Sequence, residues 1–212
     1  MDATKRQQQM RRGVTALRHQ FAQGGSGVFS AVLEGADAAQ IIETEAGHYR
    51  DRCYPPLTTL RLFIGQVLSE DGACQDVVGR HLSACVATGR RPCGLNTGPY
   101  CQARQRLPLA MPQRLSRMVG ERLESRMPKA WCWRGRHVKL FDGTTVSMPD
   151  TPENQRAFPQ SSEQKPGLGF PVARIGGLIS LASGAVLAHA VAACKGKGTG
   201  EQTLLRGLLP LI

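Results

Sequence analysis

Asp142 is the residue of this sequence best suited to metal chemistry. It lies in a run, residues 138–146, in which Val138, Leu140 and Val146 alternate with other side chains at the period of a β-strand. A carboxylate among apolar neighbours costs free energy unless it is paired, protonated or bound to a metal. Phosphoryl transfer by metal ions needs such hard oxygen ligands on a rigid sheet. Asp-Gly is also a common turn pair, so a turn at Gly143 is the alternative that the residues leave open.

A second set of candidate residues could contact DNA. Gln102 and Arg106 are four residues apart, so they share one face of a helix, and their side chains suit the edges of adenine and guanine. Arginines nearby suit phosphates. The alternative is a basic packing helix that reads no bases. The full set of candidate DNA-contacting residues is Tyr100, Gln102, Arg104, Arg106, Arg114, Arg117, Lys139, Lys195 and Lys197.

The positive charge of the chain is concentrated in one segment. The net charge is +11 over 212 residues, and residues 90–140 alone hold twelve Lys or Arg against two acids. Residues 1–89 are neutral overall. A basic block of this kind is the electrostatic signature of a polyanionic partner, although a solvated helix face or a surface for acidic lipid gives the same composition. The dominance of Arg favours nucleic acid.

The seven cysteines and the polar N-terminus indicate a reduced, cytoplasmic setting. No two cysteines have the spacing Cys-x-x-Cys, and an eight-residue interval between Cys85, Cys93 and Cys101 is not a zinc-ligand spacing. We therefore expect buried or idle thiols.

The uncharged stretch Ile175–Cys194 is long enough to span a bilayer. Because Ser183-Gly184 is a turn signal in its middle, we expect two buried strands there and no membrane partner.

The elements that must hold these residues change character near residue 135. We expect a loose tail and linker over 1–27, a helical domain over 28–135 and a domain of three strands and a helix over 136–212, which is an α+β chain. Thr199 to Gln202 is typical of a capping box. The expected helices are 28–33, 37–47 with Asp37 as N-cap, 57–70 with Leu60, Ile64, Val67 and Leu68 on one face, 73–86, 97–107, 109–126 and 204–211; residues 149–171 are expected to form a loop.

Four ordered blocks of this sequence resemble DDE-type transposases of the insertion sequence 4 group. They are residues 100–108 (YCQARQRLP), 142–151 (DGTTVSMPDT), 167–171 (GLGFP) and 195–201 (KGKGTGE), within a resemblance that covers about 57–212. The resemblance implies a helical DNA-binding part and an RNase H-like catalytic domain. It makes Asp142 a ligand of Mg²⁺ in the cleavage of double-stranded DNA at the ends of the element, followed by strand transfer.

The resemblance also implies a second Asp and a Glu, which do not match Asp150, Glu153, Glu163 or Glu201. One carboxylate holds Mg²⁺ poorly, so we expect a transposase fragment that performs no strand transfer alone. Its partners would be the element's terminal repeats and a second copy or a full-length transposase. The alternatives are a non-enzymatic DNA-binding repressor of transposition and an inert relic.

Overall fold

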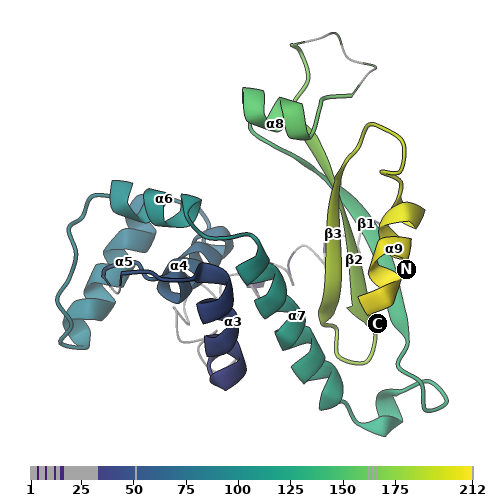
Figure 1. Ribbon diagram of the computed structural model, residues 1–212, viewed down its shortest axis with the longest axis horizontal. Coiled ribbons are helices and arrows are strands. Elements are labelled where there is room, and N and C mark those ends of the chain that lie inside the picture. Colours follow the sequence, from purple (N-terminus) through teal and green to yellow (C-terminus); the bar gives the residue numbers. More distant parts are fainter. Residues whose placement is uncertain are drawn as a thin grey trace. The chain divides into compact units, whose positions relative to one another are not determined.

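The structure is a computed structural model that describes residues 4, 8, 12, 15, 16, 33–50, 52–161, 163, 165 and 167–211 (Figure 1). Of the expected tail and linker, the structure describes residues 4, 8, 12, 15 and 16, and each of these is helical, which the expectation of a loose tail did not foresee. The expected helix at 28–33 lies outside the described set except for its last residue. The chain divides into two compact units, residues 1–115 and 116–212. The sequence placed the division at 135, where the strand pattern begins. The structural division instead falls inside one helix, α7 (Ala110–Ser125), which contributes residues to both units.

The first unit is helical. It contains α3 (Ala36–Ala46), α4 (Pro56–Leu68), α5 (Cys74–Ala87) and α6 (Gly98–Gln105). Proline near the first position of α4 and α6 suits helix starts, because the amide that it lacks would have no partner there. Helix α4 contacts both α5 and α6. Their shared core is formed by Leu62, Val77, Val78 and Tyr100.

Two details of these helices differ from expectation. The N-cap of α3 is Gly35, and Asp37 lies in the first turn, where an acid still suits the helix dipole. In α4 the buried residues are Thr59, Leu60, Leu62 and Gln66, whereas Val67 is 57% exposed. The predicted apolar face of α4 therefore does not coincide with the face that is buried. The polar Gln66 is buried because the fold supplies it with hydrogen-bond partners.

Cys53 and Cys93 form a disulfide, so the expectation that the thiols are idle fails for this pair. Their bond joins the loop before α4 to the loop before α6. A separation of 40 residues along the chain gives no sign that the fold brings these two side chains together. The sulfur atoms of Cys74 and Cys101 also touch, at 3.9 Å, without being bonded.

The second unit is built on a three-stranded antiparallel sheet. Strands β1 (Lys139–Ser147), β2 (Val172–Ser180) and β3 (Val186–Ala193) follow one another in that spatial order. This confirms the three expected strands and the turn at Ser183-Gly184, where Gly184 has φ +69°. No helix in the described part of the chain is long and apolar enough to cross a membrane.

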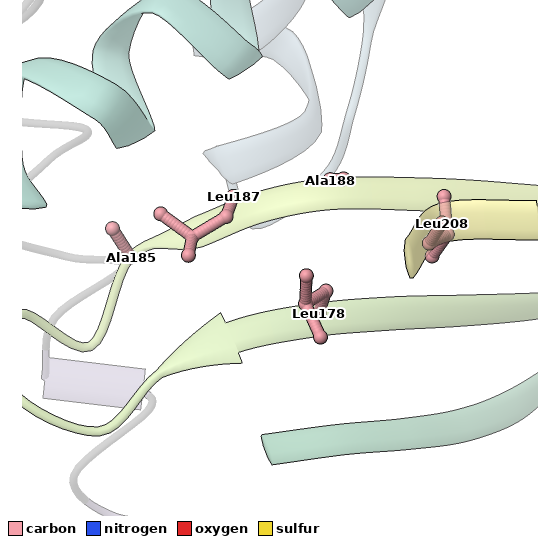
Figure 2. Packing of buried hydrophobic residues seen from close by; sticks show 5 residues of the cluster. All are labelled: Leu178, Ala185, Leu187, Ala188 and Leu208. Atoms are coloured by element: carbon pink, nitrogen blue, oxygen red, sulfur yellow. The ribbon is translucent and has the colours of Figure 1, made fainter. Parts of the chain in front are cut away.

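One face of the sheet is covered by helix α9 (Glu201–Leu208), which contacts all three strands (Figure 1). Figure 2 shows Leu208 of this helix near Leu178 of β2, in a core with Ala185, Leu187 and Ala188. Phe141 and Leu205 pack against the same core. The apolar side chains of α9 therefore fix which face of β1 is closed.

Two local predictions in the second unit were wrong. The N-cap of α9 is Gly200 and makes no side-chain cap, and the Thr199 hydroxyl instead donates to the Gly196 carbonyl at 3.0 Å. The expected loop 149–171 contains a short helix, α8 (Pro152–Ala157), whose N-cap Thr151 accepts a hydrogen bond from the Asn154 amide. Single 3₁₀ turns lie at Lys129–Trp131 and Leu209–Leu211.

Candidate nucleic-acid interface and candidate metal ligand

Helix α6 presents Gln102 and Arg106 together on its exposed face, as the four-residue spacing predicted. Both side chains line a hollow of about 660 Å³ on the first unit. An amide and a guanidinium side by side are the groups that read adenine and guanine edges. This face of α6 therefore brings together the two side chains that the sequence predicts to contact base edges.

Tyr100 and Arg104, which the sequence also assigned to DNA, face inward. The Tyr100 side chain is 0% exposed, and its hydroxyl donates to Oε1 of Gln66 at 2.8 Å. Arg104 donates to the same oxygen at 3.0 Å, and its guanidinium lies 4.6 Å from the centre of the Phe63 ring. Burial raises the pKa of Tyr100 to about 12. Tyr100 therefore braces the helices and cannot reach a phosphate or a base, whereas Arg104 is half-buried and also lines a separate hollow beside α6.

Three residues that the sequence analysis passed over share the hollow with Gln102 and Arg106. They are His48, Arg50 and Arg52, in the loop between α3 and α4. Asp51, between the two arginines in sequence, lies outside the described residues. Residues 48–52 are a short run that contains both basic and aromatic side chains, and this run could have indicated a DNA contact. It does not stand out because residues 1–89 as a whole have no net charge. A loop distant in sequence thus extends the basic surface of α6.

The remaining cationic candidates are dispersed. Arg114 pairs with Glu45, and Arg117 pairs with Glu121 at 2.8 Å, one helical turn away. Such exposed pairs contribute little to stability, so their guanidinium groups can exchange partners with phosphate.

The three lysine candidates all belong to the second unit. Lys139 begins β1, whereas Lys195 and Lys197 follow the end of β3 and are exposed. Because β1 and β3 run in the same direction on either side of β2, these lysines lie toward opposite ends of the sheet. They do not form one cluster.

Asp142 lies near the middle of β1 and its side chain is exposed. Its Oδ1 accepts a hydrogen bond from the Gly143 amide at 2.8 Å. The sequence argument assumed an apolar environment in which an unpaired carboxylate is costly, but the exposed position removes that cost. Asp142 is therefore accessible to a metal ion or water, and it lies on a strand, not in a turn.

The strand register places Asp142 in a row with two other residues. Asp142 pairs with Gly177 of β2, and Gly177 pairs with His189 of β3, so all three point to the same face of the sheet. Gly177 has no side chain, and a Cβ added there would meet nothing within 4 Å. The carboxylate and the imidazole flank an open strip above Gly177, with their strands about 10 Å apart.

A second acid, which belongs to α9, lies against the opposite face of β1. A Cβ built on Gly143 would lie 3.0 Å from the carboxyl carbon of Glu201, the first residue of α9. Glu201 is thus distant from β1 in the sequence but a neighbour of β1 in the fold. Asp142 and Glu201 emerge on different faces. Within the described residues no group of three or more His, Cys, Asp or Glu side chains is arranged to hold a metal ion.

Comparison of the chain with models of protein families, with curated proteins and with solved structures gave no match.

Proposed function

We propose that this chain acts as, or within, a DDE-type transposase of the insertion sequence 4 group. The observation that carries the proposal is the position of Asp142. It is exposed near the middle of the first strand of an antiparallel sheet ordered β1-β2-β3, and α9 covers the other face. This order of elements is the one expected of the first half of an RNase H-like domain. The four sequence blocks give independent support.

In this proposal Asp142 binds Mg²⁺, which supplies Lewis acidity and an activated water for cleavage of the DNA phosphodiester. The donor set fits in part: Asp142 offers the hard oxygen that Mg²⁺ prefers, and Gly177 leaves room for its water ligands. A single carboxylate binds the ion weakly. Efficient cleavage therefore needs further carboxylates, which the described residues do not bring to Asp142.

The first unit contacts double-stranded DNA at the ends of the element through the exposed face of α6. Gln102 and Arg106 are the proposed base-reading pair, and His48, Arg50 and Arg52 are proposed to hold phosphates around them. Binding of this kind weakens steeply as salt is raised, because neutralising each phosphate releases counterions.

The DNA interface is tested by measuring the affinity of the full chain for duplex DNA over a range of salt concentrations. Arg106→Ala should weaken binding by about 1–3 kcal/mol, or reduce the salt slope by about one if Arg106 contacts only phosphate. Arg80→Ala removes the same charge from an exposed position on α5 that pairs with Asp76, and should bind as the wild type does. Equal losses of affinity in both variants would mean that DNA binding depends on the total charge of the chain and not on this face of α6.

The metal role is tested by nicking of supercoiled DNA in Mg²⁺. Any nicking by the full chain should disappear in Asp142→Asn, and nicking that survives the substitution would remove Asp142 from the mechanism. DNA binding that depends on Arg106 without any nicking would instead favour a DNA-binding repressor of transposition. A chain that neither binds DNA nor unfolds cooperatively would be a relic.

A further inference from the structure

Two side chains of α5 lie beside the Cys53–Cys93 disulfide. His81 and Cys85 are one helical turn apart, and both line the same hollow as the two bonded cysteines. The Nε2 atom of His81 is 3.7 Å from the sulfur of Cys85. Three cysteines and one histidine, drawn from three separate segments, thus line one hollow in the first unit.

The distance between His81 and Cys85 is that of two ligands of one zinc ion. Zinc binds imidazole nitrogen at about 2.0–2.1 Å and thiolate sulfur at about 2.3 Å in tetrahedral sites, so two such ligands lie about 3.6 Å apart. Helical i, i+4 spacing places both side chains on the same side of α5. Half of a tetrahedral site is therefore already in place.

The surroundings of His81 prepare its ring to act as a ligand. The His81 ring is buried and lies against the backbone of Cys53, which limits the directions in which the ring can turn. Metal-binding histidines generally direct their second nitrogen to a carbonyl or carboxylate, which fixes the ring. Cys85 is also buried, so its thiol is shielded from bulk solvent.

Charge and hydrogen bonding around the hollow suit a site with three thiolates. A zinc ion with three thiolates and one neutral imidazole carries a net charge of −1. Arg52, Arg90 and Arg91 line the same hollow and can balance it. The hydroxyl of Tyr54 is buried without a hydrogen-bond partner among the described residues, and the Tyr54 ring lies 5.6 Å from that of His81. A thiolate would give this hydroxyl an acceptor.

We propose that Cys53, His81, Cys85 and Cys93 bind one zinc ion when the Cys53–Cys93 disulfide is reduced. A low-molecular-weight thiol reduces the disulfide and is itself oxidised to its disulfide, which releases two cysteine thiols. Zinc then binds three thiolates and displaces their protons. In the oxidised chain the two sulfurs are bonded to each other, and the described residues hold no ready metal site. Metal binding and the disulfide are therefore mutually exclusive.

The test is titration of the reduced full chain with Co²⁺ in the absence of oxygen, followed by displacement with Zn²⁺. We expect one Co²⁺ per chain, with the visible and sulfur-to-cobalt absorption bands of a tetrahedral thiolate site. Addition of Zn²⁺ should remove these bands. The chain oxidised at Cys53 and Cys93 should give no such bands. A reduced wild-type chain with seven free thiols and no tetrahedral bands would overturn the proposal, and this result depends on no variant.

Variants locate the site. Cys85→Ser should lower the affinity for Co²⁺ by more than about 100-fold, since even loss of an outer hydrogen bond to a ligand costs 10–100-fold. Cys132→Ser is the matched control, because Cys132 also lies 3.7 Å from a histidine nitrogen, that of His137, but in the second unit. Bands that disappear with Cys132→Ser and persist with Cys85→Ser would place the metal elsewhere and overturn the assignment.

Discussion

Helix α6 and strand β1 hold their candidate residues in opposite ways. In α6, which is a short helix, the candidate residues lie on two different faces. One face, with Tyr100 and Arg104, is enclosed by hydrogen bonds to Gln66, and the other, with Gln102 and Arg106, is exposed. In β1 the odd positions face α9, and the candidate Asp142 faces the side that α9 leaves open.

The difference between α6 and β1 distinguishes polar residues that stabilise the fold from polar residues that are accessible to a ligand. At α6 a cation and a phenol stabilise the fold, so loss of either should be read as a folding defect. At β1 the apolar and glycine positions stabilise the fold, and the carboxylate can change with little cost.

Gln66→Leu should destabilise the first unit by about 2–3 kcal/mol. The substitution leaves the buried Tyr100 hydroxyl and the Arg104 guanidinium without their shared acceptor, and unpaired buried groups carry their full desolvation cost. Urea unfolding measures the loss. Gln105→Leu, on the exposed part of α6, serves as the control and should change stability by less than about 0.5 kcal/mol. Equal effects would mean that Gln66 does not organise this region.

Gly176→Ala should destabilise the second unit by about 1–3 kcal/mol, because the added methyl group overpacks the closed face. A Cβ at Gly176 would lie 2.7 Å from the Phe141 ring. Its neighbour provides a matched control: Gly177→Ala adds the same methyl group on the open face, where nothing lies within 4 Å. Thermal unfolding of both variants compares the two faces directly. A larger loss for Gly177→Ala would show that the open face is covered.

Alkaline pH should weaken the first unit through Tyr100. Burial raises the pKa of this phenol to about 12, whereas an unfolded tyrosine ionises near 10. The folded chain then retains a proton that the unfolded chain loses, so stability from this group is complete below pH 10 and declines as the pH rises toward 12. Urea unfolding across this range should show a steeper decline in the wild type than in Tyr100→Phe. Parallel curves would contradict the prediction.

Asp142→Asn should change the free energy of unfolding by less than about 0.5 kcal/mol, the smallest effect of the four. The side chain is exposed, and an amide oxygen can still accept the hydrogen bond from Gly143. Thermal unfolding in the absence of Mg²⁺ measures this. A loss of unfolding free energy above 1 kcal/mol would show that Asp142 stabilises the fold, as Tyr100 and Arg104 do, and would contradict the difference between β1 and α6.

Local sequence was sufficient to predict the periodic elements. The alternation in β1, the turn at Ser183-Gly184 and the exposed pair Gln102 and Arg106 each depend on residues a few positions apart, so spacing alone predicts them. The α+β class follows from the order of these patterns. The resemblance to transposases also comes from the sequence alone, and it remains a proposal.

The tertiary structure decided which of two equivalent faces is buried and which distant residues meet. Tyr100 and Arg104 have the same four-residue spacing as Gln102 and Arg106, and only packing against α4 turns the first pair toward Gln66. The meeting of Cys53 and Cys93 with His81 and Cys85 crosses three segments. Spacing along a chain fixes relative direction around an element, but contact between elements depends on the whole packed core, which no local pattern contains.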